Sequence, residues 1–397
     1  MITGAKENYM PHYIIYRQLQ RHLDRQPVGF PRDRSGADIR LLKHHFSAEE
    51  ALIALAMSYR FERIEVIIDR LTGVIKKIKA LSSEAIPDAL TPAEIRQHLN
   101  SMSSRTTIMQ KERKGILYYC LVPLVIGMYE GRIFDLDMDY IDAFNDYAHS
   151  MQHGLSLIST GVPQMRTIPI EASITAVHDI MRYDDVKEHI NNSDGPIFIV
   201  ECICRKKSSM MGEPCKKTQR TETCMVFGDL AKQLLKFSKG REVSRDEALE
   251  IIRENQKEGL VLQAYNMQNP EVICSCCGCC CGMLSVQKML PNPRVFTTSS
   301  YHAVIDPQKC IGCRLCEKKC QVDALTFNKK QKKVSVVDKR CIGCGNCIPV
   351  CRAGALTLVK KTGVPVPPAD FESLQEAIMN KKPAWRLGRI IKRTLTK

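Results

Sequence analysis

Cysteines recur at short, regular intervals in Cys310-Ile-Gly-Cys313-Arg-Leu-Cys316-Glu-Lys-Lys-Cys320 and again in Cys341-Ile-Gly-Cys344-Gly-Asn-Cys347-Ile-Pro-Val-Cys351. Each copy has the spacing C-x2-C-x2-C-x3-C. Spacing this tight wraps three thiolates around one corner of a [4Fe-4S] cluster, and the three-residue step carries the fourth sulfur to a neighbouring cluster. The pattern therefore predicts two [4Fe-4S] clusters. Disulfides and structural zinc are the alternatives, but zinc sites usually pair two C-x2-C hooks over a longer gap.

The two predicted clusters exchange one ligand each. We assign the first cluster to Cys310, Cys313, Cys316 and Cys351, and the second to Cys341, Cys344, Cys347 and Cys320. This segment resembles a two-cluster bacterial-type ferredoxin, which implies a pseudo-two-fold βαβ repeat. The proline that usually follows the fourth cysteine is missing, because Gln321 and Arg352 stand in its place. That difference weakens the turn but leaves the number of ligands unchanged.

Composition indicates an intracellular protein of several domains. The chain has 397 residues with 44% hydrophobic content, enough for two or three domains with cores of their own. The start, Met1-Ile2-Thr3-Gly4, shows no signal peptide, and no run of about 18 apolar residues predicts a membrane span. Nineteen cysteines without a secretory signal favour metal ligation in a reducing cytoplasm. We expect an anaerobic, cytoplasmic setting.

The chain is basic, with a formal net charge of +15. Residues 303–361 alone contain 13 lysines and arginines against 4 acids, whereas small soluble ferredoxins are typically acidic. A basic face predicts an acidic redox partner, such as a flavoprotein or another oxidoreductase, with nucleic acid as the alternative. A short helix is expected over Phe371–Met379. The basic end of the chain, residues 381–397, is amphipathic enough for peripheral membrane contact or a partner groove, although docking back on its own chain fits equally.

The N-terminal region reads as helices followed by a hairpin. After a short helix over Tyr13–Leu23, capping boxes at Ser47–Glu50 and Thr91–Glu94 each predict a helix start, and a further helix is expected over Ile64–Lys79. Thr107–Leu121 reads as strand, charged turn, strand. This order is similar to a winged helix. Its basic residues would then contact DNA: Arg96, Arg105, Lys111, Arg113 and Lys114. Protein docking, or a helical domain with a solvated hairpin, are the alternatives.

A second cysteine-rich region precedes the ferredoxin-like segment. A helix over Ala176–Ile190 and a strand at Ile197–Val200 are expected to lead into it, and a helix from Ser244 and a strand at Leu260–Ala264 interrupt it. Its ten cysteines are Cys202, Cys204, Cys215, Cys224, Cys274, Cys276, Cys277, Cys279, Cys280 and Cys281. They suffice for one or two more iron–sulfur clusters, for one cubane plus a second metal, or for one cluster of unusual nuclearity. Zinc is a minor alternative. Adjacent cysteines rarely converge on one iron corner, so such pairs serve two centres or leave one thiol free.

The arrangement as a whole is similar to 4Fe-4S dicluster ferredoxin-domain proteins of anaerobic bacteria. The resemblance rests on Cys202-x-Cys204-Arg205, on Cys224-x3-Gly228, on the run Cys276-Cys-Gly-Cys-Cys-Cys281 and on the ferredoxin-like segment. The segment Pro27-Val-Gly-Phe-Pro31 also matches. The resemblance implies cluster binding and a winged-helix-like N-terminal region, and it implies no specific reaction.

These patterns predict an α+β multidomain protein. We expect a mainly helical, winged-helix-like domain over 1–160, a cysteine-rich α/β cluster-binding domain over 161–300, the two-cluster ferredoxin domain over 301–361 and a basic tail over 362–397. The leading hypothesis is an iron–sulfur electron-transfer protein. A redox-sensing DNA-binding regulator and an iron–sulfur subunit of an oxidoreductase complex are the alternatives. No nucleotide-binding glycine loop, flavin fingerprint or Ser/His/Asp set is evident, so a stand-alone enzyme is not favoured.

Overall fold

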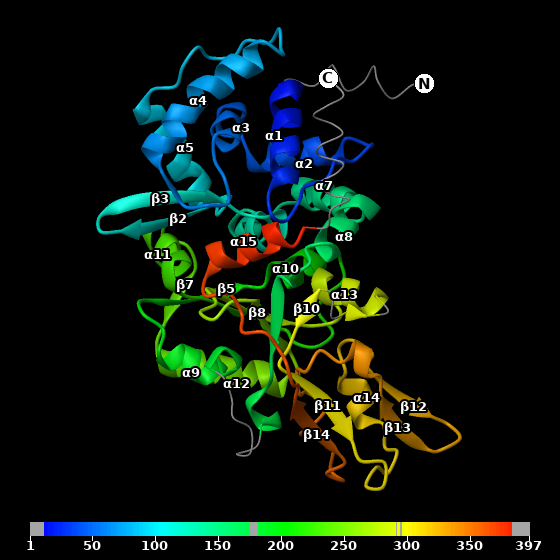
Figure 1. Cartoon of the computed structure of the whole chain (residues 1–397). Helices are drawn as coiled ribbons and strands as arrows, with labels where there is room; N and C mark the ends of the chain where they lie inside the picture. The colour runs from blue at the N-terminus through cyan, green and yellow to red at the C-terminus, as the bar shows by residue number, and fades with distance from the viewer. Residues whose placement is uncertain (1–11, 175–181, 291, 294–295, 383–397) are drawn as a thin grey trace. The chain divides into compact units, whose positions relative to one another are not determined.

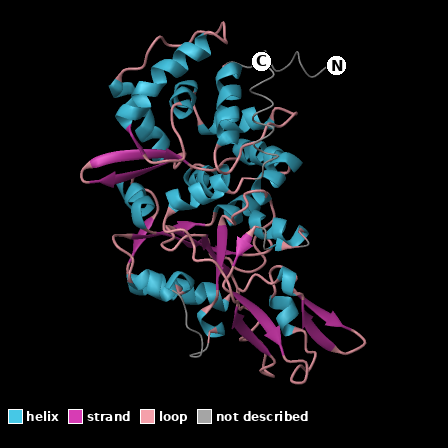
Figure 2. Ribbon diagram, in the orientation of Figure 1, coloured by secondary structure: helices cyan, strands magenta, loops and turns pink. Residues whose placement is uncertain are grey.

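The computed structural model describes residues 12–174, 182–290, 292–293 and 296–382 (Figure 1). The chain forms two compact units. The first comprises residues 1–161, 233–239 and 375–397, and the second comprises residues 162–232 and 240–374. Helices and small sheets are mixed along the chain (Figure 2), which agrees with the predicted α+β class. None of the helices within the described ranges is long and apolar enough to span a membrane.

The first unit is mainly helical. Its helices are α1 (Tyr13–Arg25), α2 (Ala37–His45), α3 (Ala48–Leu55), α4 (Ile64–Lys79), α5 (Pro92–Ser104), α6 (Tyr129–Gly131), α7 (Met138–Ala148) and α8 (Met151–Ile158). Both predicted capping boxes are present, at Ser47 before α3 and at Thr91 before α5. In each box the hydroxyl accepts from the third helical N–H and the glutamate accepts from the cap N–H, so two unpaired donors are satisfied. The predicted helix over Ile64–Lys79 is confirmed at both ends.

A three-stranded antiparallel sheet follows these helices. It contains β1 (Glu62–Arg63), β2 (Ile108–Arg113) and β3 (Ile116–Leu121) in the order β1-β3-β2. The strand–turn–strand prediction for this stretch is confirmed. Cys120 on β3 is fully buried.

The second unit is built on a seven-stranded sheet. The strand order is β10-β4-β8-β9-β6-β5-β7. The strands are β4 (Met165–Ile168), β5 (Ile197–Glu201), β6 (Glu222–Val226), β7 (Arg241–Val243), β8 (Val261–Tyr265), β9 (Val272–Cys276) and β10 (Thr297–Thr298). All neighbours are antiparallel except the edge pair β10 and β4.

An apolar core that includes side chains of α9 and α12 covers one face of this sheet. The helices connected to the sheet are α9 (Val186–Asn191), α10 (Ile203–Met210), α11 (Gly228–Lys236), α12 (Arg245–Lys257) and α13 (Gly282–Met289). Val186 and Ile190 of α9 and Ile252 of α12 pack on side chains such as Met225 and Ile273 of the central strands. Because side chains alternate along a strand, Cys224, Cys274 and Cys276 lie on the opposite face.

The ferredoxin-like segment continues the second unit as two small antiparallel sheets. β11 (Tyr301–Ile305) pairs with β14 (Leu356–Lys360), and β12 (Leu325–Asn328) pairs with β13 (Lys333–Val336). Helix α14 (Leu315–Lys319) lies between the two sheets in Figure 1. The corresponding stretch of the second repeat, after Cys344, forms turns in place of a helix.

Three predicted helices differ in detail from the structure. The expected helix over 176–190 lies partly outside the described residues. Its described part consists of a short 3-10 turn (Arg182–Asp184) and α9, because the Asp185 carboxylate accepts from two backbone N–H groups and starts a new helix. The predicted helix at Tyr13 extends to Arg25, and the one at Phe371 is α15 (Phe371–Asn380). The basic stretch 383–397 lies outside the described residues.

Candidate iron–sulfur and metal centres

Four ferredoxin-segment thiols line one cavity of the second unit. Cys320 follows α14 in the first repeat, whereas Cys341, Cys344 and Cys347 belong to the second repeat, and all four line the same cavity. The remaining lining is largely apolar and includes Val322, Ala324, Leu325, Val336 and Ile342. Burial raises the pKa of Cys344 to about 12, so a bare thiol there stays protonated at neutral pH. A metal must displace that proton when it binds.

Backbone amides already point at two of these sulfurs. The Ala324 N–H donates to the Cys320 sulfur at 3.2 Å, and the Ala303 N–H donates to the Cys341 sulfur at 3.3 Å. Amide donors of this kind stabilise thiolates and raise the reduction potential of a cluster. The four thiols and the amide donors of this cavity therefore fit a [4Fe-4S] cluster in their donor chemistry.

The other four ferredoxin-segment thiols are nearer the surface. Cys316 of α14 has Cys351 and Cys313 as electrostatic neighbours, and burial followed by these thiols raises its pKa to about 11. Cys316 is buried, Cys310 and Cys351 are half-buried, and Cys313 is exposed. Cys310 follows β11 through a turn in which its N–H donates to the Asp306 carbonyl at 3.2 Å. The structure thus brings Cys351 of the second repeat to the thiols of the first.

The two repeats share a glycine with a left-handed backbone. Gly312 and Gly343 each precede the second cysteine of their repeat, and each has a φ of +70°. A Cβ at Gly312 would lie 2.1 Å from the Lys332 carbonyl oxygen, and one at Gly343 would lie 2.3 Å from the Tyr301 carbonyl oxygen. Both constraints select glycine, because the chain must turn sharply and pass close to another backbone to return to the cluster.

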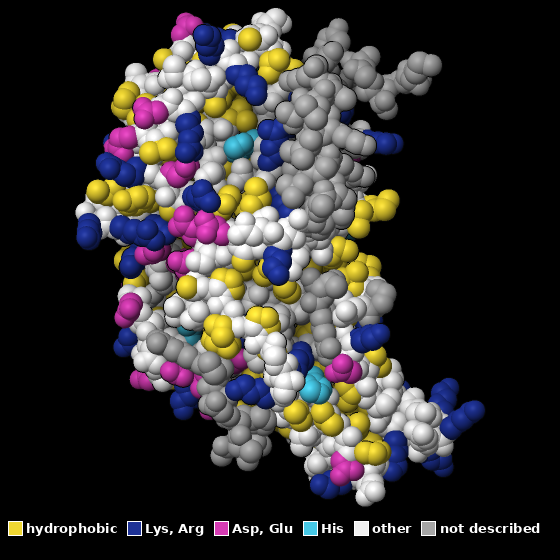
Figure 3. All heavy atoms as spheres, in the orientation of Figure 1, with side chains coloured by type: hydrophobic (Ala, Val, Ile, Leu, Met, Phe, Trp, Pro, Cys, Tyr) yellow, Lys and Arg dark blue, Asp and Glu magenta, His cyan; other side chains and the backbone are white. Residues whose placement is uncertain are grey.

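Lysines surround the exposed part of this segment. The turn between β12 and β13 carries Lys329, Lys330 and Lys332 as exposed side chains. The tip that this hairpin forms is dark blue in Figure 3. Beside Cys313, the apolar side chain of Ile311 is 72% exposed.

Six of the ten middle-region cysteines form a closed ring of thiols. Around the ring, each side chain is a hydrogen-bonding neighbour of the next, and the order is Cys202, Cys204, Cys281, Cys276, Cys274, Cys224 and back to Cys202. We call this set the six-thiol ring. Hydrogen bonds with Cys202 and Cys281, followed by burial, raise the pKa of Cys204 well above its ordinary value. Bound iron would supply the positive charge that lets these thiols ionise together.

The sheet and two helix starts build the ring. Cys224 of β6 faces Cys274 of β9 across the sheet, and Cys276 lies two residues further along β9. Cys202 is the N-cap of α10 and Cys204 lies in its first turn. Cys281 is the N-cap of α13. Half of the ring therefore comes from strands.

A buried arginine supports the ring from one side. Arg205 is 3% exposed, and its guanidinium donates to the Ser275 carbonyl at 3.1 and 3.2 Å and to the Thr223 hydroxyl. Cys202, Cys224 and Cys277 are its closest electrostatic neighbours. A cation at this position offsets thiolate charge.

One buried amide beside the ring has no protein partner. Gln263 of β8 pairs in register with Cys274, so the two side chains lie on the same face of the sheet. Gln263 is fully buried, yet neither its Nε2 nor its Oε1 has a hydrogen-bond partner. Leaving both atoms unpaired costs about 1–3 kcal/mol each. An amide N–H at this position fits a sulfide of a bound cluster as acceptor.

The remaining four middle-region cysteines form a compact set. Cys215 lies in the loop between α10 and β6, and Cys277, Cys279 and Cys280 lie in the turn between β9 and α13. All four sulfurs lie within 4.8 Å of one another. We call them the compact cysteine set. Burial and the neighbouring Cys215 and Cys279 raise the pKa of Cys277 to about 12. Two adjacent pairs are split between the two groups: Cys276 and Cys281 belong to the six-thiol ring, and their neighbours Cys277 and Cys280 belong to the compact cysteine set. The adjacent cysteines Cys279 and Cys280 both belong to the compact cysteine set.

The basic residues that were predicted to contact DNA all lie in the first unit. Of the five predicted DNA contacts, Lys111 is buried with its ammonium over the Phe61 ring at 3.6 Å, and Arg105 is ion-paired with Glu50 at 2.6 Å. Arg96, Arg113 and Lys114 are exposed. Two of the five are therefore engaged inside the unit.

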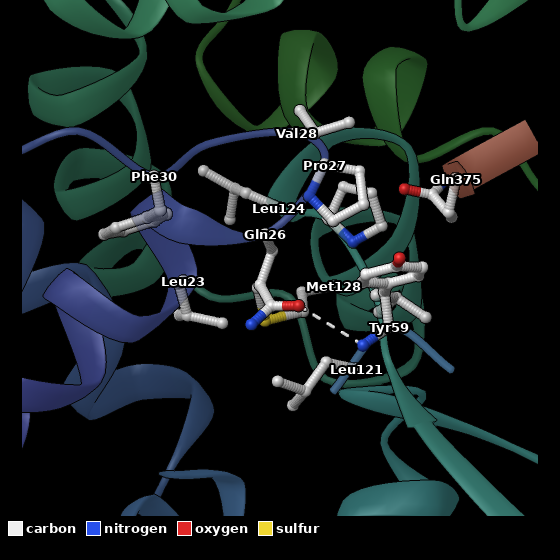
Figure 4. A pocket seen from close by; sticks show the side chains of 12 residues that line it. Leu23, Gln26, Pro27, Val28, Phe30, Tyr59, Leu121, Leu124, Met128 and Gln375 are labelled. Atoms are coloured by element: carbon white, nitrogen blue, oxygen red, sulfur yellow. Dashed lines mark hydrogen bonds between the residues drawn. The ribbon is translucent and has the colours of Figure 1, made fainter. Parts of the chain in front are cut away.

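A small pocket of the first unit encloses the segment around Pro27 (Figure 4). Pro27, Val28 and Phe30 line it, and the Gln26 side chain accepts from the Tyr59 N–H at 3.2 Å. None of its lining residues is charged. The pocket therefore reflects the packing of the irregular segment between α1 and α2.

The comparisons with known proteins agree with the ferredoxin-segment geometry. A family model described as a 4Fe-4S dicluster domain matches residues 303–358. The searches of curated proteins and of solved structures returned no match. Residues 303–358 thus form an iron–sulfur domain, and this domain together with the many cysteines indicates iron–sulfur electron transfer.

Sequence reasoning missed several residues that the structure brings to the centres. The sequence predicts Gln263 only as part of a strand. Helix α11 was also missed, and so was the division of the ten cysteines into six and four. One usable signal was the spacing of Cys274 and Cys276, because alternate residues of a strand share a face.

Proposed function

We propose that this protein passes single electrons between redox partners through a relay of iron–sulfur clusters. The relay consists of the two ferredoxin-type [4Fe-4S] clusters and a third iron–sulfur centre in the six-thiol ring. The observation that carries the proposal is the cavity shared by Cys320, Cys341, Cys344 and Cys347. It joins thiols from both repeats, as the two-cluster spacing requires.

The burial of the ligands supports a direction for the relay. The first cluster, with the exposed Cys313, would exchange electrons at the surface. The second cluster is more enclosed. The ring has no exposed member, and its Cys276 and Cys281 belong to the same apolar cluster of side chains as Cys316, Cys341 and Cys347. This packing supports a continuous route from the ring to the surface.

The surface chemistry supports an acidic partner. Exposed Ile311 offers an apolar contact close to Cys313, and Lys329, Lys330 and Lys332 provide a positive field. Complementary charge accelerates encounter at low salt and has less effect at high salt. We therefore expect electron transfer to an acidic protein to depend on ionic strength.

Stopped-flow mixing tests this proposal. The protein is loaded anaerobically, reduced and mixed with an oxidised acidic flavodoxin. The double variant Lys329→Glu and Lys330→Glu should slow the second-order rate about tenfold at low salt. The matched control, Lys76→Glu with Lys77→Glu on exposed positions of α4, should leave the rate unchanged. A reduced protein that reoxidises with neither flavodoxin nor a small one-electron acceptor would refute electron transfer.

Metal analysis tests the third centre separately. The ferredoxin-type clusters contribute about eight iron atoms per chain, so a ring centre raises the content to about twelve or more, with matching acid-labile sulfide. A wild-type content that stays at about eight would leave the ferredoxin-type clusters as the whole relay.

A further inference from the structure

The spacing of the compact cysteine set is that of a single ion. The Cys215 sulfur lies 3.6 Å from the Cys277 sulfur and 3.7 Å from the Cys279 sulfur, and the Cys279 and Cys280 sulfurs are 3.7 Å apart. Four thiolates bound tetrahedrally to one zinc ion at about 2.3 Å place neighbouring sulfurs about 3.8 Å apart. The observed separations match that tetrahedron.

The ferredoxin-type thiols provide an internal comparison. In a cubane each thiolate binds a different iron, so the width of the cluster core separates the sulfurs. Within the described part of the chain, no other set of three or more candidate ligand atoms is as compact as Cys215, Cys277, Cys279 and Cys280. The eight ferredoxin-segment thiols and the six-thiol ring are therefore more open than this set. The compact cysteine set has no room for a cubane core between its sulfurs.

The local sequence also fits a structural zinc site. Cys277-Gly278-Cys279-Cys280 contains a C-x2-C hook, and Cys215 reaches it from a distant loop. The Lys217 N–H donates to the Cys215 sulfur at 3.5 Å. The positive charges of Arg205 and Lys217 would offset the double negative charge of a zinc tetrathiolate.

We infer that Cys215, Cys277, Cys279 and Cys280 bind one tetrahedral Zn²⁺ ion, separate from the iron–sulfur relay. Four protein sulfurs close the coordination sphere, so the ion has a structural role. It ties the loop after α10 to the turn that precedes α13. Ring cysteine Cys204 lies in α10, which leads into this loop, and ring cysteine Cys281 ends this turn as the N-cap of α13, so the zinc ion holds the ring in shape.

Crossed variants test the division of the cysteines. The double variant Cys215→Ser with Cys279→Ser changes the two least buried members of the set, one from each segment. In anaerobically purified full-length protein, zinc should fall from about one per chain to nearly none, with the ferredoxin-type EPR signals retained. The counterpart Cys224→Ser should lose iron and sulfide but keep zinc. Lys216→Ala, an exposed neighbour, should keep both.

Loss of iron and labile sulfide instead of zinc from the double variant would overturn the inference. Zinc X-ray absorption on the wild-type protein gives a second reading that does not depend on variant folding. Four sulfur scatterers at about 2.3 Å support the site, and nitrogen or oxygen ligands, or no bound zinc, overturn it. Retained ferredoxin-type signals with altered zinc would leave the proposed electron transfer intact, so the two proposals fail independently.

Discussion

The ferredoxin segment and the middle region hold their cysteines in different ways. In the ferredoxin segment, three ligands of each predicted cluster lie within seven consecutive residues, and a single exchange links the repeats. In the middle region, the six-thiol ring draws on two strands, one helix and two N-caps. The contrast teaches that a ligand set whose cysteines are closely spaced can be predicted from the sequence. Ligand sets made by strand pairing and helix starts become visible only when the chain is folded.

The largest effect is expected from breaking the exchange between the ferredoxin repeats. Cys320→Ser should remove the second cluster, since serine is a poor ligand and the buried cavity admits no substitute. About four of the eight ferredoxin-type irons should be lost, together with the magnetic coupling between the reduced clusters. Cys344→Ser should alter the same EPR signal, and Cys316→Ser the other one. If Cys320→Ser and Cys316→Ser change the same signal, the exchanged assignment is wrong.

A ring variant should have a smaller effect, because five thiols remain. Cys281→Ser removes the sulfur that lies between Cys204 and Cys276 in the ring. We expect partial loss of middle-region iron, measured by metal and sulfide analysis, while the ferredoxin-type signals persist. Loss of all clusters together would mean that the two regions form one cooperative metal site. The ferredoxin segment and the middle region would then not hold separate ligand sets.

A glycine pair sharpens the role of local backbone geometry. Gly343→Ala should destabilise the second unit by about 2–4 kcal/mol, because the positive φ and the close Tyr301 carbonyl both oppose a Cβ. Gly354→Ala is the matched control: its φ is +59°, but no atom lies within 4 Å of the new Cβ, so about 1 kcal/mol is expected. Anaerobic denaturant unfolding with cluster absorbance as the probe measures both. Equal losses would show that the close approach is unimportant.

The smallest effect is a shift in potential. Arg205→Gln removes a buried positive charge near the ring, so the reduction potential of the ring centre should fall by on the order of 100 mV. Redox titration of the ring signal measures the shift. The exposed Lys216→Gln should change the potential much less, since solvent screens its charge. A rise in potential in the Arg205 variant would contradict this electrostatic account.

Much of the local structure could be predicted, and particular residues show why. Ser47 with Glu50 and Thr91 with Glu94 satisfy donors only a few residues away, so both helix starts follow from sequence. The hairpin of β2 and β3 could also be predicted, because its charged turn joins two strands that are adjacent in the sequence. The fate of Lys111 could not be predicted, because its stacking on Phe61 depends on a residue 50 positions earlier in the chain.

The sequence alone determined the repeated cysteine spacing and its glycines, because three thiols within seven residues can meet only around one small inorganic core. It also predicted that the ten further cysteines serve metal binding. Only the tertiary structure decided how those ten divide. The register of β6 with β9 aligns Cys224 with Cys274, and the N-caps of α10 and α13 bring Cys202 and Cys281 to the same ring. Strand register depends on packing across the whole sheet, so no local spacing encodes it.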